Sequence, residues 1–260
     1  MDRDEANDRQ FVTALARGIE ILRCFSLGWS ELGTTEIAAL TGLPQSTVWR
    51  LCHTLQCLGV LVPGQDPQRL RPGYGLLSLG YAALAKGSVA ELAEPAMREV
   101  AQRFGLALSL AARDRDAMVI IARAEGPSIL RLALSVGSSL PIATSALGWA
   151  WLAGLPEGER RQVLQRLRRA AGETWPEIGA AIEAALRQHA RDGFVFNLRQ
   201  FHPDVNAIGV PVVSPGGRRV LALNCGGAVS VATPEVLAGP IAAALKDIAA
   251  RLAPALETQG

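Results

Sequence analysis

The sequence lacks the features that mark membrane, secreted and zinc-binding proteins. No run in its 260 residues approaches the ~20 consecutive apolar residues that a membrane-spanning helix needs. Its first ten residues, MDRDEANDRQ, are too charged for a signal or transit peptide. Cys24, Cys52, Cys57 and Cys225 form no CxxC pair and have no histidine at zinc-ligand spacing. We therefore expect a cytoplasmic protein with reduced cysteines, no cofactor, no metal and no membrane partner.

Catalytic motifs are also missing. The chain has no Walker-type loop, no GxSxG, no HExxH and no DxDxDG sequence. His202, Asp204 and Cys225 have the side chains of a thiol–imidazole–carboxylate site. Their spacing does not favour that geometry, and Pro203 indicates a simple turn. We predict that the protein is not an enzyme, with a thiol enzyme that uses Cys225 as the less favoured alternative.

Charge of one sign is scarce as well. The net charge is +2, and charged residues make up 19% of the chain. Between Arg17 and Gly87 there are six lysines and arginines against four acidic residues. Nucleic-acid binding would then depend on a few placed arginines in an oligomer, because no large basic face is available. Hydrophobic residues, at 49%, are sufficient for one large domain or two ordinary ones.

The most informative stretch is Thr34 to Gly59, which predicts two short helices joined at Gly42. The second helix has an apolar stripe of Val48, Leu51, Cys52, Leu55 and Leu58. Its opposite side carries Gln45, Ser46, Thr47, Trp49, Arg50, His53 and Thr54. Polar groups near the start of the second helix are typical of a helix-turn-helix that binds DNA. A plain helical hairpin is the alternative.

The flanking segments complete a small domain. Periodicity predicts a helix over Phe11–Phe25 and a loop over Leu27–Gly33. Val60–Val62 and Arg69–Arg71 predict a hairpin, typical of the winged variety of helix-turn-helix or of an ordinary closing hairpin. Arg69 and Arg71 could there reach phosphates or a minor groove. A helix over Tyr74–Lys86 follows, and Gly87-Ser88 is the predicted boundary.

Beyond the boundary, strands alternate with helices, which predicts an α+β domain with an antiparallel sheet and helices at its sides. The predicted strands are 106–112, 118–124, 129–135, 194–196, 207–213 and 220–225. The predicted helices are 89–104, 145–153, 157–170, 175–191 and 234–252, the last capped by Thr233. Gly137–Pro141 is predicted to be a loop.

Two features of this domain suggest a ligand site. A helix that starts at Ser145 would offer unpaired N–H groups to a carboxylate or phosphate, although Thr144 or Ser145 could simply cap it. Asn197, Asn206 and Asn224 lie at strands in an apolar context. Their buried amides need partners, which a polar ligand, the backbone or water could each provide.

The ordered motifs resemble those of IclR-family transcriptional regulators, over nearly the whole chain. They are ALARGIEILRCF, EIAALTGLPQSTVWRLCHTL, LRPGYGLLSLG, VGSSLPIATSALGWAWLAG and RDGFVFNLRQFHPDVNAIGVPVVSPGGRRVLALNCGGAV. The resemblance implies a winged helix-turn-helix domain (residues 1–73), a linker helix (74–87) and a GAF-like effector-binding domain (88–260). It further implies a repressor or activator that binds double-stranded operator DNA as a homodimer or homotetramer. The effector would be a small carboxylate or aromatic acid. A small-molecule sensor that acts through protein contacts is the main alternative.

Positions matched to the family motifs give candidate site residues. For DNA they are Thr34, Thr35, Gln45, Ser46, Thr47, Trp49, Arg50, His53, Arg69 and Arg71. For the effector they are Ile129, Leu132, Leu140, Ala146, Leu147, Asn197, Val205, Ala207, Asn224 and Gly226. Trp149, Asn197 and Asn224 depart from the family's common Lys, acidic residue and Ser. We therefore expect no cation to face the ligand, N–H groups near Ala146 and Leu147 to hold its carboxylate, and Asn197 and Asn224 to set specificity.

Overall fold

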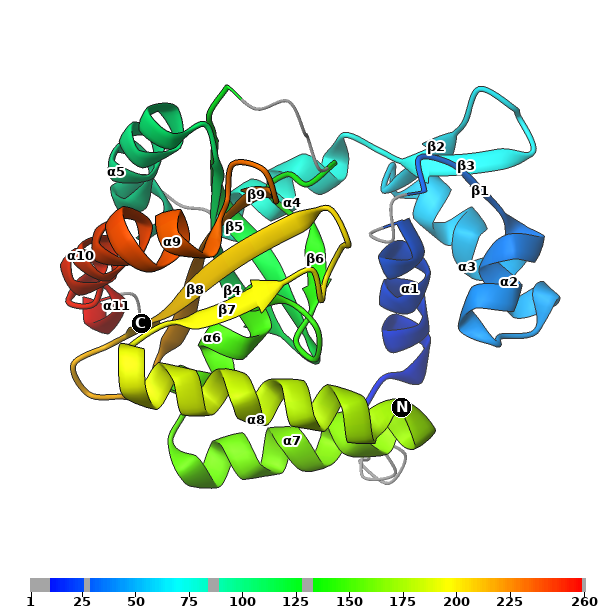
Figure 1. Ribbon diagram of the computed structural model, residues 1–260. Coiled ribbons are helices and arrows are strands. Elements are labelled where there is room, and N and C mark those ends of the chain that lie inside the picture. Colours follow the sequence, from blue (N-terminus) through cyan, green and yellow to red (C-terminus); the bar gives the residue numbers. More distant parts are fainter. Residues whose placement is uncertain (1–9, 26–28, 84–88, 128–132, 259–260) are drawn as a thin grey trace. The chain divides into compact units, whose positions relative to one another are not determined.

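The chain divides into two compact units, residues 1–85 and 86–260 (Figure 1). A computed structural model describes residues 10–25, 29–83, 89–127 and 133–258. In those ranges no helix is long and apolar enough to cross a membrane. The candidate residues Ile129 and Leu132 lie outside the described residues.

The first unit is the predicted winged helix-turn-helix. It contains α1 (Thr13–Cys24), β1 (Leu32–Gly33), α2 (Thr34–Thr41), α3 (Gln45–Cys57), β2 (Leu61–Pro63) and β3 (Arg69–Pro72). Gly42 makes the corner between α2 and α3 in the left-handed region, at φ 67°, which costs little without a Cβ atom. The fully buried Ile21, Ile37 and Val48 join α1, α2 and α3 in one core. The helix-turn-helix prediction is therefore confirmed.

Two details of this unit differ from the sequence prediction. Leu32–Gly33, predicted as loop, forms β1, which pairs with β3 in a sheet of order β1-β3-β2. Leu58 was placed in the buried stripe, but 69% of it is exposed because α3 ends at Cys57. Both differences arise at the ends of elements, where a nonlocal partner or the helix end overrides the local pattern.

After the hairpin comes α4 (Gly75–Ala83), within the predicted Tyr74–Lys86 segment. Its apolar side chains are largely solvent-exposed: Leu77 by 68%, Leu79 by 66% and Tyr81 by 68%. The helix contains no charged residue. An apolar helix with this exposure has a surface that water solvates poorly.

The second unit is built on one six-stranded antiparallel sheet of order β6-β5-β4-β9-β8-β7 (Figure 1). Its strands are β4 (Ala107–Asp114), β5 (Ala117–Glu125), β6 (Ser139–Pro141), β7 (Val195–Leu198), β8 (Val205–Val213) and β9 (Val220–Ala228). Its helices are α5 (Val89–Phe104), α6 (Ala146–Gly154), α7 (Glu157–Ala171), the 3-10 turn η3 (Gly172–Thr174) and α8 (Trp175–Asp192). The chain closes with α9 (Pro234–Val236), η4 (Leu237–Ile241), α10 (Ala242–Leu252) and α11 (Ala255–Thr258). The α+β prediction is confirmed.

Helices cover both faces of this sheet. One apolar core joins α5 and α10 to the sheet through residues such as Met97, Leu245 and Leu108. The other joins α6, α7 and α8 through residues such as Leu152, Val163 and Ile182. Figure 1 shows α5 and α10 on one side of the strands and α7 and α8 on the other. Any pocket on the sheet must therefore open between these layers.

The structure corrects two further predictions in this unit. Of the predicted strand Ile129–Ser135, the described part is not a strand. Ser139–Pro141, predicted as loop, forms β6, which pairs with β5. The predicted helix 234–252 starts with the expected Thr233 cap, whose Oγ1 accepts from the Val236 N–H at 3.4 Å. It is then interrupted at Gly239, which has non-helical angles before Pro240, because proline clashes with the preceding turn.

Candidate functional site

Strand register brings four separate strands together around a pocket. Arg123 on β5, Ser109 on β4, Asn224 on β9 and Gly209 on β8 are successive cross-strand partners. The next row on the same face contains Ala107, Gly226, Ala207 and Asn197. The pocket over these rows has an empty volume of about 500 Å³, which includes space open to solvent. Its lining is Ala107, Ser109, Arg123, Leu134, Leu140, Ser145, Ala146, Leu147, Asn197, Phe201, Val205, Ala207, Asn224 and Gly226.

The start of α6 lies against this sheet because small residues allow a close approach. A Cβ atom on Gly209 would lie 2.7 Å from the Ala146 carbonyl oxygen, and one on Gly148 would lie 2.2 Å from that of Ile142. Ser145 caps the helix: its Oγ accepts from the Gly148 N–H at 3.1 Å and donates to the Pro141 carbonyl at 2.7 Å. The capping interpretation of Ser145 is therefore confirmed, and the cap places Ala146 and Leu147 at the pocket wall.

The three asparagines have different surroundings. Asn197 is 1% exposed, donates to the Thr144 carbonyl at 2.8 Å and accepts from the Phe201 N–H at 3.0 Å. Asn206 donates to the Ala232 carbonyl at 3.0 Å and does not line the pocket. Asn224 lines the pocket, and its Oδ1 is buried without a partner among the described residues. The backbone thus engages Asn197 and Asn206, whereas Asn224 keeps a buried acceptor for a ligand.

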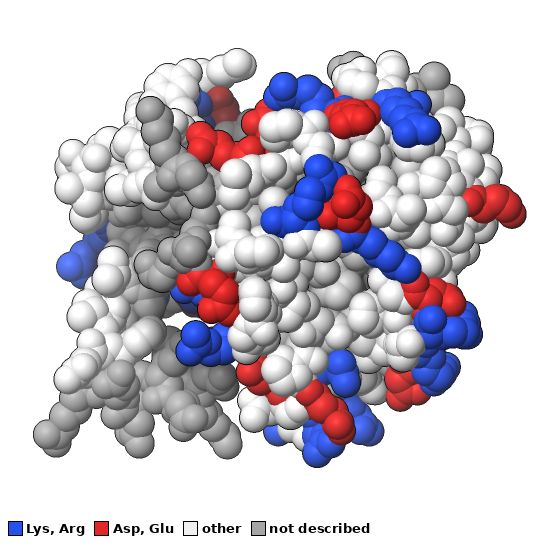
Figure 2. All heavy atoms as spheres, turned by 90° about the vertical axis from the view of Figure 1, so that its left-hand side faces the viewer, with Lys and Arg blue, Asp and Glu red and all other residues white. Residues whose placement is uncertain are grey.

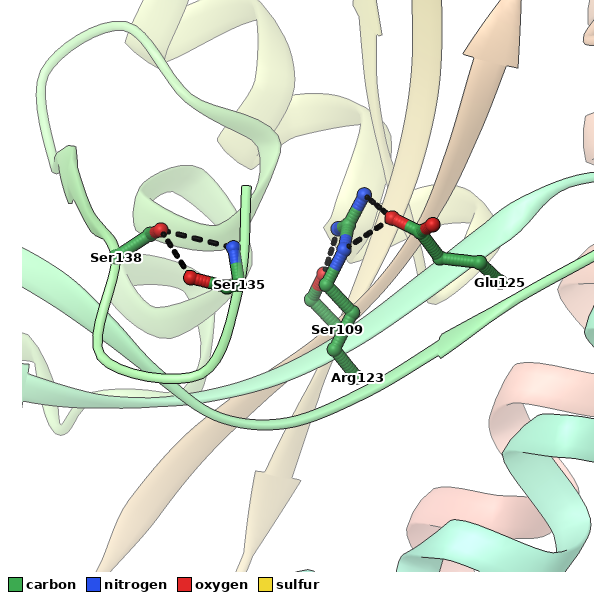
Figure 3. Close-up of polar contacts among 5 residues, drawn as sticks. All are labelled: Ser109, Arg123, Glu125, Ser135 and Ser138. Atoms are coloured by element: carbon green, nitrogen blue, oxygen red, sulfur yellow. Dashed lines mark hydrogen bonds and ion pairs between the residues drawn. The ribbon is translucent and has the colours of Figure 1, made fainter. Parts of the chain in front are cut away.

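The expectation that no cation faces the ligand is wrong, because Arg123 lines the pocket. Its side chain is 10% exposed, and Figure 3 shows it between Ser109 and Glu125. Nε and Nη2 both lie 2.8 Å from Oε1 of Glu125, and Nη1 donates to Ser109 Oγ at 2.8 Å. Ser135 and Ser138, also in Figure 3, close the turn before β6, with the Ser135 N–H donating to Ser138 Oγ at 2.9 Å. The pocket therefore has a fixed guanidinium on its β5 side.

Most of the predicted effector residues meet at this pocket. Its lining includes Leu140, Ala146, Leu147, Asn197, Val205, Ala207, Asn224 and Gly226. Sequence reasoning missed the lining residues Ala107, Ser109, Arg123, Leu134, Ser145 and Phe201. Alternation along β5 could have placed Arg123 on one face with Val119 and Ile121. It could not have told which face carries the pocket.

The candidate thiol site is not assembled. Cys225 is fully buried in the apolar core, and burial raises the pKa of its thiol to about 12. A thiol in this setting is protonated at neutral pH and inert as a nucleophile. His202 accepts the Asp204 N–H through Nδ1 at 3.2 Å, which closes a local turn. Within the described ranges no group of three or more metal-ligating side chains is present.

The candidate nucleic-acid surface lies on α3. Ser46, Trp49, Arg50 and His53 are exposed and Thr47 is half-buried. Gln45 is exposed too, and its Nε2 donates to Thr35 Oγ1 at 3.0 Å and to Thr34 Oγ1 at 3.3 Å, which connects the starts of α2 and α3. Trp49, 60% exposed, stacks on His53 with ring centroids 5.7 Å apart. The helix thus presents hydrogen-bonding groups and a flat aromatic surface to solvent.

The two arginines of the hairpin are partly engaged within the unit. Arg69 forms an ion pair with Glu36 at 2.8 Å and donates to the Glu31 carbonyl at 3.0 Å. The Gly33 N–H, and then Arg69, lower the pKa of Glu36. The Arg71 guanidinium lies 5.8 Å from the Tyr74 ring centroid. Arg69 therefore has a structural role, and DNA contacts by either arginine stay predictions.

No other large basic face competes with α3 in the views available. Figure 2 shows lysines and arginines interspersed with acidic residues over one face of the molecule, among wide uncharged areas. In the arginine-rich α7, Arg161 pairs with Glu157 at 2.6 Å and Arg166 with Asp116 at 3.6 Å. This pattern is that of a solvated helix face, the interpretation that charge runs usually deserve.

Two family models match the chain. The model described as IclR helix-turn-helix domain matches residues 14–63, and the one described as bacterial transcriptional regulator IclR C-terminal matches residues 81–253. Among curated proteins, the HTH-type transcriptional regulator TsaQ1/TsaQ2 of Comamonas testosteroni is 33% identical, over 95% of this chain and 89% of its own.

Solved structures agree with this assignment. An IclR family transcriptional regulator from Brucella abortus has a TM-score of 0.83 and 39% identity, covering 95% of this chain and 93% of its own. An IclR homologue complexed with 4-hydroxybenzoate, from Microbacterium hydrocarbonoxydans, shares the fold at a TM-score of 0.71 and 24% identity, with 94% of this chain and 99% of its own covered. With the winged domain and the pocket domain both matched in order, the chain belongs to the IclR family of transcriptional regulators.

Proposed function

We propose that the protein binds operator DNA through α3 and that a small organic acid in the pocket of the second unit controls this binding. The observation that carries the DNA part is the exposed set on α3, where Arg50, Ser46 and Trp49 have no role in the core. Arg50 can donate two hydrogen bonds to guanine in the major groove, while Thr34, Thr35 and the hairpin contact the DNA backbone. Repression and activation are both compatible with this arrangement.

The test is a competition gel shift with the chain's own promoter region. Arg50→Ala should lose ~10- to 100-fold in preference for the operator over random DNA, since one bidentate pair gives about 1–3 kcal/mol of discrimination. Arg161→Ala is the matched control, because Arg161 is an exposed, ion-paired arginine on α7. An unchanged preference in Arg50→Ala would contradict base reading. Absence of any promoter binding, at any salt concentration, would favour a sensor that acts through protein contacts.

The pocket supports a small organic acid as effector. The helix start at Ala146 and Leu147 provides N–H groups and the positive end of the helix dipole for a carboxylate. Leu140, Val205 and Phe201 provide apolar walls. The fold neighbour complexed with 4-hydroxybenzoate supports an acid of this size. In a thermal-shift screen of small acids, a ligand at 100 times its Kd should stabilise the protein by about 2.7 kcal/mol.

We also propose that the protein acts in the cytoplasm as a homodimer, or a dimer of dimers, formed through α4 as the linker helix between residues 1–73 and 88–260. The support is the uncharged α4 surface with exposed Tyr74, Leu77, Leu79 and Tyr81. A dimer would place two copies of α3 on two half-sites, which offsets the small number of arginines in each copy. Leu77→Lys should shift the mass measured by light scattering toward the monomer, whereas Glu183→Lys on the exposed face of α8 should not.

A further inference from the structure

We propose that the pocket selects an aromatic acid with a hydroxyl group opposite its carboxylate, and that Arg123, Ser109 and Asn224 recognise this hydroxyl. The inference rests on the proposed effector function, which it deepens by naming the ligand class. Two polar ends and a flat floor between them carry it. The structure assigns these parts to separate strands, so each can be altered by itself.

The polar ends lie on different strands. The start of α6 is held over β8, where a Cβ atom on Gly209 would touch the Ala146 carbonyl. Arg123 is on β5, and the strand order β5-β4-β9-β8 separates the two by three strand spacings. At ~4.8 Å each, those spacings amount to about 14 Å between the two strands. Since the Arg123 side chain spans part of that distance, the space left between the ends suits one ring with a substituent at each side.

The floor between the ends is made of very small side chains. Ala107, Gly226 and Ala207 are neighbours on β4, β9 and β8 in one row of the sheet. A Cβ atom on Gly226 would come within 3.0 Å of the Ala207 Cβ, so only glycine keeps this floor low. Leu140 and Leu147 also line the pocket. A floor without branched side chains favours a planar ring lying on it over a bulky aliphatic ligand.

The second polar end asks for a group that both accepts and donates a hydrogen bond. Arg123 has five N–H bonds; two meet Glu125 and one meets Ser109, which leaves two for a ligand. Asn224 Oδ1, from the same row, is a buried acceptor without a partner among the described residues. A hydroxyl group can accept from Arg123 and donate to Asn224 at once. An ionised carboxylate can only accept.

Glu125 disfavours a second carboxylate at this end. Its carboxylate already binds Arg123 through Nε and Nη2, so the charge of the guanidinium is largely balanced. A ligand carboxylate beside Arg123 would meet the like charge of Glu125. The pocket should therefore rank 4-hydroxybenzoate above benzoate, which lacks the hydroxyl, and above terephthalate, which carries a second charge.

Calorimetric titration of the full chain with these three acids and 4-methoxybenzoate tests the proposal. We expect 4-hydroxybenzoate to bind at least ~10-fold more tightly than the other three, because a site built around a hydroxyl loses a hydrogen bond with each of them. 4-Methoxybenzoate is informative because its ether oxygen accepts from Arg123 but cannot donate to Asn224. This series needs no variant, so it tests the inference even if a substitution prevents folding.

Variants then assign the preference to residues. Asn224→Leu and Arg123→Met should each reduce the ratio of 4-hydroxybenzoate to benzoate affinity toward one, and Glu125→Gln should raise the affinity for terephthalate. Arg98→Met, an arginine paired with Glu94 on the surface of α5, should keep the wild-type ratio. Equal binding of benzoate and 4-hydroxybenzoate by the wild type would overturn the inference and leave the proposed function intact. If none of the acids binds, both are overturned.

Discussion

The α3 surface and the pocket are both polar, but they are assembled in opposite ways. The α3 surface comes from one continuous helix, and its side chains are exposed. The pocket draws its lining from α6 and from β4 to β9, and its polar groups are buried or half-buried. A surface that waits for DNA can leave its donors in water at little cost. A pocket must first satisfy its own buried groups, because each unpaired one costs about 1–3 kcal/mol.

This difference explains which pocket groups remain for a ligand. Asn197 has the side chain expected to set specificity, yet it is fully engaged with the Thr144 carbonyl and the Phe201 N–H. Asn224 has the same side chain one strand-pair away, and its Oδ1 has no partner among the described residues. Two identical residues thus serve different ends: one holds the pocket walls in place, and the other is available to a ligand.

The largest expected effect comes from blocking the close approach that builds the pocket. A Cβ atom on Gly148 would lie 2.2 Å from the Ile142 carbonyl oxygen, within a buried part of the unit. Because backbone must move to relieve this contact, Gly148→Ala should destabilise the protein by about 3 kcal/mol and abolish ligand binding. Urea unfolding followed by circular dichroism measures the loss.

Gly158→Ala is the matched control for that variant. Gly158 lies in the first turn of α7, and nothing lies within 4 Å of the Cβ position. The same substitution should there change stability by less than about 1 kcal/mol, with a tendency to stabilise. Equal unfolding midpoints for the two variants would contradict the view that steric contact at the start of α6 shapes the pocket.

The same contrast explains how much could be predicted from the sequence. The helix-turn-helix was predictable because its periodicity, its Gly42 corner and its polar face are all local. The eight lining residues within the described ranges were found by resemblance, not by pattern. Arg123 was missed because its role depends on strand register: only the pairing of β5 with β4 and of β4 with β9 brings it beside Ser109 and Asn224. The strand β6 was missed for the same reason.

The next prediction separates the two asparagines by stability. Asn197→Leu leaves the Thr144 carbonyl and the Phe201 N–H without their partner at a site that is 1% exposed. It should therefore cost about 2 kcal/mol of unfolding free energy. Asn224→Leu removes an acceptor that has no protein partner, so it should cost less than about 1 kcal/mol while changing ligand selectivity. Thermal unfolding of the two variants side by side decides this; an equal loss would mean that both asparagines are structural.

The smallest expected effect belongs to an exposed bond of the first unit. The Gly33 N–H donates to Glu36 at 2.7 Å and, with the help of Arg69, lowers the pKa of Glu36 below its usual 4.5. A carboxyl whose pKa is lower in the folded state stabilises the protein above its unfolded pKa, and this contribution is lost as the pH falls through the folded pKa.

Glu36→Gln should therefore lower the Tm slightly at pH 7 and leave it unchanged well below the folded pKa, where wild-type Glu36 is also neutral. The change should be smaller than that of Asn197→Leu, because water screens and competes for a bond at an exposed carboxylate. Scanning calorimetry of both proteins between pH 3 and pH 7 measures it. A Tm difference that stays constant across that range would mean that Glu36 acts through packing or geometry and not through its charge.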